Sequence, residues 1–252
     1  MNTENPLLKP NEQPFDTVPF EDIKTSDFLP AINFSLKEAV QNIEKITGNS
    51  NPADFSNTIL ALEMSSEKLD KVSTVYFHLF GSESDKDFQD LASQISQILA
   101  NYNNDIMLDK RLFNRVKSVF DQMSPSMKKQ DKKLTEVWYK EFIRNGATLG
   151  DDEKDKLRKL DAELSTLSPQ FQNNNLNATN SYELWLNEKD LDGLPEIAIN
   201  AAKVDAIGKG KPDDWLITLQ MPSFQPFITF SSNRELRKEI MSAFSRKCNG
   251  DD

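Results

Sequence analysis

Apolar residues spaced three or four positions apart constrain the fold of this sequence more than any other feature. In one early segment they are Ile32, Leu36, Val40, Ile43 and Ile46, which share a single face of an α-helix. Comparable rows recur along most of the chain up to residue 171, and only 8 of its 252 residues are glycine. The pattern predicts a mainly α fold of long antiparallel helices, arranged as a bundle or array.

The longest of these helices is expected to start at Asp151, where acidic residues are favoured by the helix dipole. Its apolar residues follow at steps of 3, 4, 3 and 4, and they are Leu157, Leu160, Leu164, Leu167 and Phe171. This spacing is nearly a heptad repeat, which is typical of paired helices. We therefore expect this helix to pack antiparallel against another one.

The pattern changes at both ends of the chain. Residues 1–22 contain four prolines, which exclude a helix and indicate an extended arm. After Asn180, alternating residues in Tyr182–Leu186 and apolar runs in Trp215–Leu219 and Phe227–Phe230 predict short strands between helical segments. The sequence thus divides into an arm (1–22), a helical domain (23–148) and a part with the long helix and a small β element (149–252).

The supply of metal-ligating and catalytic side chains is very small. His78 and Cys248 are the single histidine and the single cysteine of the chain. A zinc site of the His/Cys type needs three or four such ligands, and a catalytic triad would have to use His78, which lies in an aromatic helical segment. We expect no catalytic, cofactor-binding or metal-binding residue in these 252 residues.

Three other groups of residues invite a functional interpretation, and each has a simpler structural one. The segment 208–211 is rich in Gly and Lys but lacks the spacing of a phosphate-binding loop. Asp190 and Asp192 lack the remaining ligands of a calcium loop. The acidic cluster at 151–155 stands where a helix begins, so we interpret it as structural.

The overall charge argues against nucleic acid as a partner. The chain has 30 basic and 40 acidic residues, a net charge of −10, whereas phosphate binding requires a basic surface. The basic stretch around 128–133 is typical of a solvated helix face, with an acidic partner as the alternative.

No run approaches the roughly 18 apolar residues of a transmembrane helix, and the N-terminus does not have the pattern of a signal peptide. We expect a cytoplasmic chain that does not contact membranes.

Several segments, in order along nearly the whole chain, are similar to those of a known family. They are Asn5–Leu8, Pro19–Ile23, Phe142–Ala147, Leu160–Leu164 with Leu167, Ser168 and Phe171, Asn177–Asn180, Leu191–Pro195, Trp215–Leu219, Met221–Phe224, and Asn233–Arg237 with Ala243, Phe244 and Arg246. This ordered set resembles the thimet oligopeptidase family of zinc metallopeptidases, which includes oligopeptidase A and dipeptidyl carboxypeptidase. None of the segments is a catalytic signature.

The resemblance implies the N-terminal portion of a longer, mostly helical enzyme that hydrolyses short peptides. In that family one zinc ion is held by a His-Glu-x-x-His helix, a motif that this sequence does not contain. The resemblance therefore implies that the chain alone is inactive, that 149–252 begin the catalytic half, and that the chain forms part of a substrate-channel wall. Its partners would be short peptides and the missing catalytic half.

Two further expectations concern the surface and the alternative function of the chain. A chain separated from that half should expose apolar surface, above all after Asn180, through which it could self-associate. The alternative function is that of a stand-alone helical interaction or scaffold domain without catalytic activity.

Overall fold

A computed structural model describes residues 5–10, 13–82 and 85–249. The fold is mainly α-helical with one small two-stranded sheet, as the sequence predicts. The chain divides into two compact units, Met1–Pro169 and Gln170–Asp252, which are treated separately below. The domain boundaries expected at 22 and 148 stay predictions.

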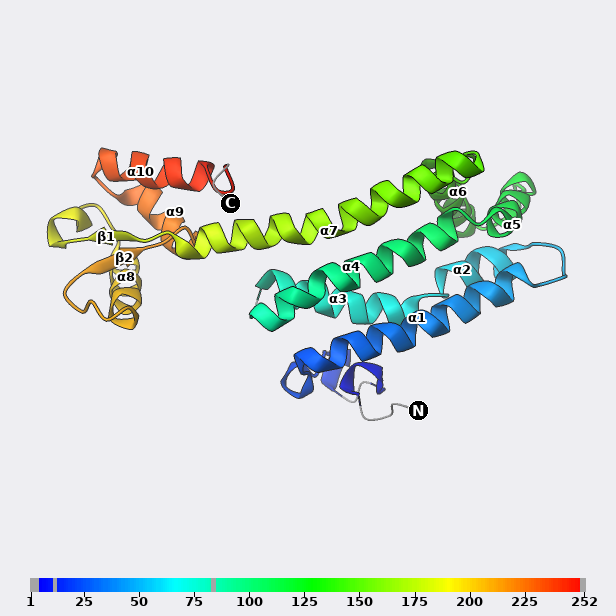
Figure 1. The fold of residues 1–252 in the computed structure, drawn as a ribbon, viewed down its shortest axis with the longest axis horizontal. Helices are drawn as coiled ribbons and strands as arrows, with labels where there is room; N and C mark the ends of the chain where they lie inside the picture. The colour runs from blue at the N-terminus through cyan, green and yellow to red at the C-terminus, as the bar shows by residue number, and fades with distance from the viewer. Residues whose placement is uncertain (1–4, 11–12, 83–84, 250–252) are drawn as a thin grey trace. The chain divides into compact units, whose positions relative to one another are not determined.

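The first unit is built from helices, most of them long, that reverse direction along the chain. They are α1 (Thr25–Thr47), α2 (Ala61–Glu63), α3 (Glu67–Ser82), α4 (Lys86–Met107), α5 (Lys110–Asp121), α6 (Lys129–Arg144) and the first part of α7 (Asp151–Ser181). Helix α1 runs antiparallel to α3, and α4 then returns beside both (Figure 1). The antiparallel helical array predicted from the apolar spacing is confirmed.

An aromatic cluster holds α1, α3 and α4 together. Tyr76 stacks on Phe88 with 4.6 Å between ring centroids, and Phe28 meets the Tyr76 ring edge to face at 5.3 Å. All three side chains are buried. Aromatic pairs in these geometries stabilise a core beyond the area that they bury.

The proline-rich arm is more structured than the sequence suggests. It forms short 3₁₀ turns at Pro6–Leu8, Pro14–Asp16 and Phe20–Asp22. The first two begin with a proline, which is compatible with the first position of a helical turn because no backbone donor is needed there. Leu7 and Leu8 pack against the core of α1, α3 and α4. Residues 1–4 and 11–12 of the predicted arm lie outside the described residues.

The segment from Phe55 to Ser82 is not one continuous helix. It begins as a π-helix at Phe55–Leu60, continues as α2, and resumes as α3 after a turn at Met64–Ser66. In this turn the buried Ser65 hydroxyl donates to the carbonyl of Leu62 at 2.7 Å. Serine competes with the helix for such local backbone bonds, which the apolar spacing does not reveal.

Helix α7 starts at Asp151, as predicted, but its leucine row does not form the expected packed seam. Another face of α7 contacts the end of α4. The Lys154 ammonium donates to the carbonyl of Leu108, the residue that follows α4, at 3.0 Å, and Arg158 pairs with Asp105 of α4. That face lies about 130° around the helix axis from Leu160, Leu164 and Leu167. These leucines are exposed, so the near-heptad row itself does not form a packed contact in the first unit.

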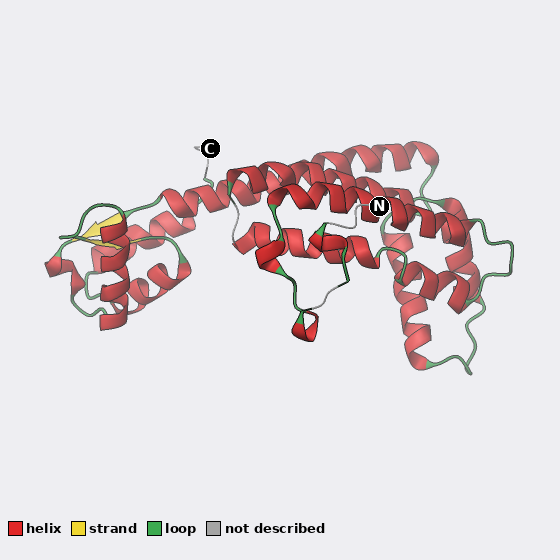
Figure 2. Cartoon of the chain, turned by 90° about the horizontal axis from the view of Figure 1, so that it is seen from below, coloured by secondary structure: helices red, strands yellow, loops and turns green. Residues whose placement is uncertain are grey.

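The second unit surrounds a two-stranded antiparallel sheet. Strand β1 (Leu184–Leu186) pairs with β2 (Trp215–Ile217), with Trp185 opposite Leu216. Figure 2 shows these two strands among otherwise helical segments. Helices α8 (Glu196–Gly208), α9 (Met221–Phe230) and α10 (Arg234–Ser245) complete the unit. The predicted small β element of the C-terminal third is confirmed.

One predicted strand in this unit is wrong. The run Phe227–Phe230 lies in α9, with Phe224 and Phe227 buried on one face three residues apart. A proline in the first turn of α9 is compatible with a helix start, whereas short apolar runs do not distinguish a strand from a buried helix. Along the described part of the chain, no helix combines the length and the apolar character that crossing a membrane would require.

Candidate functional site

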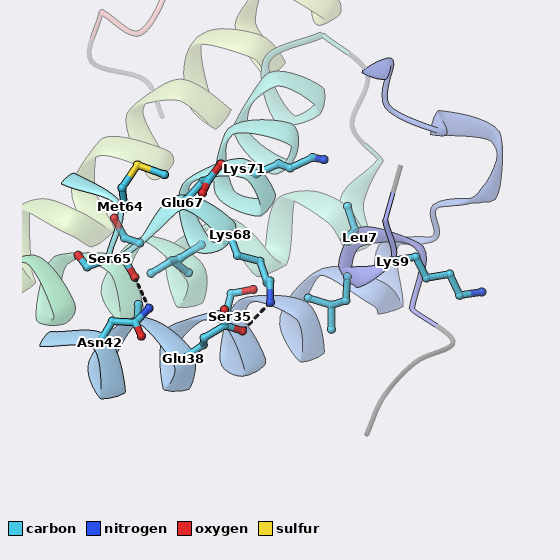
Figure 3. A pocket seen from close by; sticks show the side chains of 14 residues that line it. Leu7, Lys9, Ser35, Glu38, Asn42, Met64, Ser65, Glu67, Lys68 and Lys71 are labelled. Carbon is cyan, nitrogen blue, oxygen red and sulfur yellow. Dashed lines mark hydrogen bonds and ion pairs between the residues drawn. The ribbon is translucent and has the colours of Figure 1, made fainter. Parts of the chain in front are cut away.

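The first unit contains a small pocket between α1 and the turn that leads into α3. One wall comes from Ser35, Glu38, Ala39 and Asn42, which lie on one face of α1 because their steps are 3, 1 and 3. The opposite wall is the segment 64–71, and Leu7, Leu8 and Lys9 of the arm line it as well. Its volume is about 250 Å³, enough for a small polar molecule (Figure 3).

Polar contacts cross this pocket from α1 to α3. Figure 3 shows Lys68 reaching Glu38, with 2.5 Å between the ammonium nitrogen and the carboxylate oxygen. The side-chain amide of Asn42 donates to the backbone carbonyl of Ser65 at 3.1 Å. The hydroxyl of Ser35 is buried and finds no hydrogen-bond partner within the described residues.

The chemistry of this pocket suits binding rather than catalysis. Its charged side chains are three lysines and two glutamates, and it is lined by neither histidine nor cysteine. The Ser66 hydroxyl donates to the carboxylate of Asp70 at 2.7 Å, without an imidazole that could act as general base. Opposite charges at these distances can orient a small polar ligand, but they do not form a nucleophile–base pair.

The two side chains that zinc or nucleophilic chemistry would need are in different units. His78 lies on the exposed side of α3 in the first unit. Cys248 follows α10 in the second unit and forms no disulfide. Among the residues that the structure describes, no three His, Cys, Asp or Glu side chains come together in a way that could hold a metal ion. These donors therefore do not fit the zinc that the resemblance implies, and no catalytic step is assigned to them.

The acidic cluster at 151–155 occupies the first turn of α7. Asp151 pairs with Lys110 of α5 at 2.8 Å, and the hydrogen bond from Lys110 lowers the pKa of the Asp151 carboxyl. The carboxylate of Glu153 accepts a hydrogen bond from the backbone N–H of Gly150 at 3.1 Å. The acidic residues therefore lie at the start of a helix, as the sequence predicts, and Asp151 and Glu153 have structural partners there.

The lysines of the Gly- and Lys-rich segment contact the β-sheet. Lys211 lies over the ring of Trp185 on β1 at 3.8 Å, and Lys209 pairs with Glu183 at 2.7 Å. The hydrogen bond from Lys209 lowers the pKa of Glu183. Asp190 accepts a hydrogen bond from the backbone N–H of Asn187 at 3.2 Å, as part of a 3₁₀ turn. The segment 208–211 and the turn at Asp190 thus both have structural contacts within the second unit.

No pattern in the sequence predicts the pocket itself. Ser35, Glu38 and Asn42 are polar residues beside the apolar row of α1, a position where polar side chains normally face water. The partners of Asn42 and Glu38 lie 23 and 30 residues later, in and just after the turn that no periodicity predicts.

No family model matches the chain. Individual proteins do match, over nearly its whole length. Dipeptidyl carboxypeptidase of Escherichia coli (strain K12) is 34% identical over 245 residues, which are 96% of this chain and 36% of that protein. Probable cytosolic oligopeptidase A of Arabidopsis thaliana is 29% identical over 261 residues, covering 98% of this chain and 36% of the relative.

Oligopeptidase A of Escherichia coli (strain K12) is 26% identical over 245 residues, which are 96% of this chain and 35% of that protein. The chain therefore spans about a third of the length of the relatives that it matches. All three relatives are peptidases by name. Over nearly all of its length, this chain is homologous to the dipeptidyl carboxypeptidases and oligopeptidases A of the thimet oligopeptidase family.

Proposed function

We propose that this chain is the N-terminal, non-catalytic region of a zinc-dependent oligopeptidase that hydrolyses short peptides in the cytoplasm. The observation that carries the proposal is the match of 96% of the chain to 36% of a dipeptidyl carboxypeptidase. The name of the probable cytosolic relative supports the compartment. In this proposal the partners are short peptides and a catalytic portion that supplies the metal site.

The physical role proposed for the chain is to form part of the wall of a substrate channel. Residues 23–148 would form the first helical domain, and 149–252 would begin the catalytic half. The aromatic core of α1, α3 and α4 supports this role, because a rigid wall can select short peptides and hold them in one orientation. The enzyme's one zinc ion would be held by residues outside these 252, since His78 and Cys248 cannot form a site together with other described donors.

The direct test measures zinc and hydrolysis with the purified chain. We expect no stoichiometric zinc after dialysis, by elemental analysis, and no cleavage of fluorogenic peptides. A double variant, His78→Ala with Cys248→Ser, serves as the matched control and should behave identically. One zinc per chain, together with hydrolysis that disappears in the double variant, would overturn the proposal.

A second test separates an enzyme region from a stand-alone scaffold. The gene is sequenced beyond the codon for Asp252. A reading frame that continues to a His-Glu-x-x-His motif supports the proposal, because that motif places two zinc ligands one helical turn apart. A stop codon directly after Asp252 would favour the scaffold.

A further inference from the structure

The pocket between α1 and the turn into α3 contains a buried hydroxyl that the fold itself does not use. Ser35 lines this pocket and is 1% exposed, and its Oγ has no hydrogen-bond partner within the described residues. Most buried side-chain polar atoms in folded proteins are paired, because an unpaired one costs stability. The Ser35 hydroxyl therefore indicates a molecule in the pocket with which it can share a hydrogen bond.

An ion pair next to Ser35 presents both signs of charge to the same pocket. Glu38 lies one turn further along α1, and its carboxylate pairs with the ammonium of Lys68 at 2.5 Å (Figure 3). The two side chains are still 42% and 40% exposed. An ammonium has three donors and a carboxylate has two oxygens, so each group can bind a second partner while the pair stays intact.

This ion pair favours a ligand that carries both charges itself. A simple anion attracted to Lys68 would be repelled by Glu38, and a simple cation attracted to Glu38 would be repelled by Lys68. A molecule with one ammonium and one carboxylate meets an opposite charge at each group. Because the charged atoms of the pair are 2.5 Å apart, the two charges of the ligand must also be close together. They are close in a free α-amino acid, in which both groups are attached to one carbon.

The rest of the pocket favours an apolar side chain on this ligand. Leu7 and Leu8 of the arm, Ala39 of α1 and Leu69 of α3 line it. Its volume of about 250 Å³ is below the roughly 300–1,000 Å³ typical of pockets for drug-sized ligands, so it suits a smaller molecule. All of the lining residues lie between positions 7 and 71, so the first unit alone forms the pocket.

We propose that this pocket binds a free α-amino acid with an apolar side chain. The ligand's carboxylate accepts hydrogen bonds from the Lys68 ammonium and the Ser35 hydroxyl, and its ammonium donates to the Glu38 carboxylate. Its side chain packs against Leu7 and Leu8, so the arm forms one wall of the site. The proposal does not depend on the peptidase function.

Heteronuclear NMR titration of the purified chain with L-leucine tests the ligand class. We expect saturable shifts of the backbone amides at 35–39 and 65–69, which line the pocket. Leucinamide lacks the carboxylate and isocaproate lacks the ammonium, and each should bind at least ~10-fold more weakly, because each loses a charge-assisted hydrogen bond. Glycine, without the apolar side chain, and the dipeptide leucyl-leucine, with its charges further apart, should also bind more weakly.

The proposal is overturned if leucine causes no saturable shifts, or if the shifts lie outside the pocket. It is also overturned if leucinamide or isocaproate binds as tightly as leucine, since the pocket would then not recognise both charges. Equal or tighter binding of the dipeptide would exclude a site built for a free amino acid.

Two substitutions with matched controls test the assigned contacts. Ser35→Ala should weaken leucine binding about 5-fold through the lost hydrogen bond, and it should leave the fold intact because the hydroxyl has no partner within the described chain. Ser73→Ala is its control, because that hydroxyl bonds to the carbonyl of Asp70 on α3 and does not line the pocket. Unchanged affinity in Ser35→Ala would overturn the proposal.

Lys68→Gln should weaken leucine binding at least ~10-fold, because it removes the charge that meets the ligand's carboxylate. It should also reduce the difference in affinity between leucine and leucinamide, which a merely structural role of Lys68 would not change. Lys86→Gln is the control, because Lys86 pairs with Asp90 on α4, away from the pocket. Equal effects of the two lysine substitutions would show that Lys68 does not contact the ligand, and would overturn the proposal.

Discussion

The hydroxyl of Tyr76 on α3 donates a 2.6 Å hydrogen bond to the backbone carbonyl of Phe88, at the start of α4. The rings of the same two residues stack 4.6 Å apart. Phe88 thus contacts both the ring and the hydroxyl of Tyr76. Burial raises the pKa of the Tyr76 hydroxyl well above its usual value near 10.

Tyr76→Phe should lower the free energy of unfolding by about 1 kcal/mol, because it removes the hydrogen bond and keeps the ring. The raised pKa also predicts a pH effect. The folded state holds the hydroxyl proton more tightly than the unfolded state, so this stabilisation is complete below pH 10 and is lost as the pH rises above it. Urea unfolding between pH 8 and 11.5 measures both effects.

The variant should show a shallower loss of stability with alkaline pH than the parent chain, since lysines titrate equally in both. Equal slopes for the two proteins above pH 10 would show that the Tyr76 hydroxyl does not couple to folding.

Residues that follow a single period reveal their place in the fold from sequence. Ile32, Ile43 and Ile46 of α1 are buried as their spacing predicts, and Asp109 and Asn233 begin helices where such residues commonly do. The exposed leucines of α7, Leu160, Leu164 and Leu167, show the limit of this reasoning. Their spacing predicts a helix and an apolar partner, but periodicity does not say whether that partner is another helix of the same unit.

The candidate pocket could not be predicted in the same way. Glu38 and Lys68 are 30 residues apart, and their pairing depends on where the chain turns at Met64–Ser66. That turn lies within a row of apolar residues whose spacing predicts one continuous helix. The scarcity of catalytic side chains, in contrast, follows directly from counting one histidine and one cysteine.

Asp109 should contribute measurably to the start of α5. Its carboxylate accepts hydrogen bonds from the backbone N–H groups of Arg111 at 2.7 Å and Leu112 at 3.3 Å. Burial alone would raise the pKa of Asp109, but these bonds and the Arg111 guanidinium outweigh it and lower the pKa. Asp109→Ala should cost about 1 kcal/mol at pH 7, measured by urea unfolding.

The lowered pKa gives this contribution a defined pH range. It is complete above about pH 4, the usual value for an aspartate, and is lost as the pH falls through the lowered pKa. Asp109→Asn is the matched control, because asparagine also caps helices but does not titrate. If Asp109→Asn destabilised as much as Asp109→Ala at pH 7, capping would not be the reason for the effect.

Gly193 in the second unit should tolerate no side chain. Its φ is +85°, and a Cβ at this position would lie 2.3 Å from the backbone carbonyl oxygen of Phe230. Gly193→Ala should therefore lower the free energy of unfolding by about 3 kcal/mol or more, from backbone strain and overlap together. Fluorescence of Trp185 and Trp215 on the β-sheet reports the unfolding of this unit.

Gly210→Ala is the matched control for Gly193→Ala. Gly210 has a similar φ of +77°, but a Cβ added there would meet no described atom within 4 Å. The substitution should cost only the strain of a left-handed conformation, about 1 kcal/mol. Equal losses in the two variants would show that the close approach to Phe230 does not matter.

Two serines that line the pocket should respond in opposite ways to removal of the hydroxyl. The buried Ser35 hydroxyl has no hydrogen-bond partner in the described chain, whereas the buried Ser65 hydroxyl donates to the carbonyl of Leu62 at 2.7 Å. Ser35→Ala should leave stability unchanged or raise it by up to about 1 kcal/mol, because it removes an unsatisfied buried group. Ser65→Ala should lower it by about 1 kcal/mol.

Thermal unfolding of the two variants and the parent chain, under one set of conditions, measures the difference. Both substitutions remove a single oxygen from a buried site, so their volume effects cancel in the comparison. A clear loss of stability in Ser35→Ala would mean that its hydroxyl has a bonding partner in solution, such as a water molecule in the pocket, because only a satisfied hydroxyl stabilises the fold.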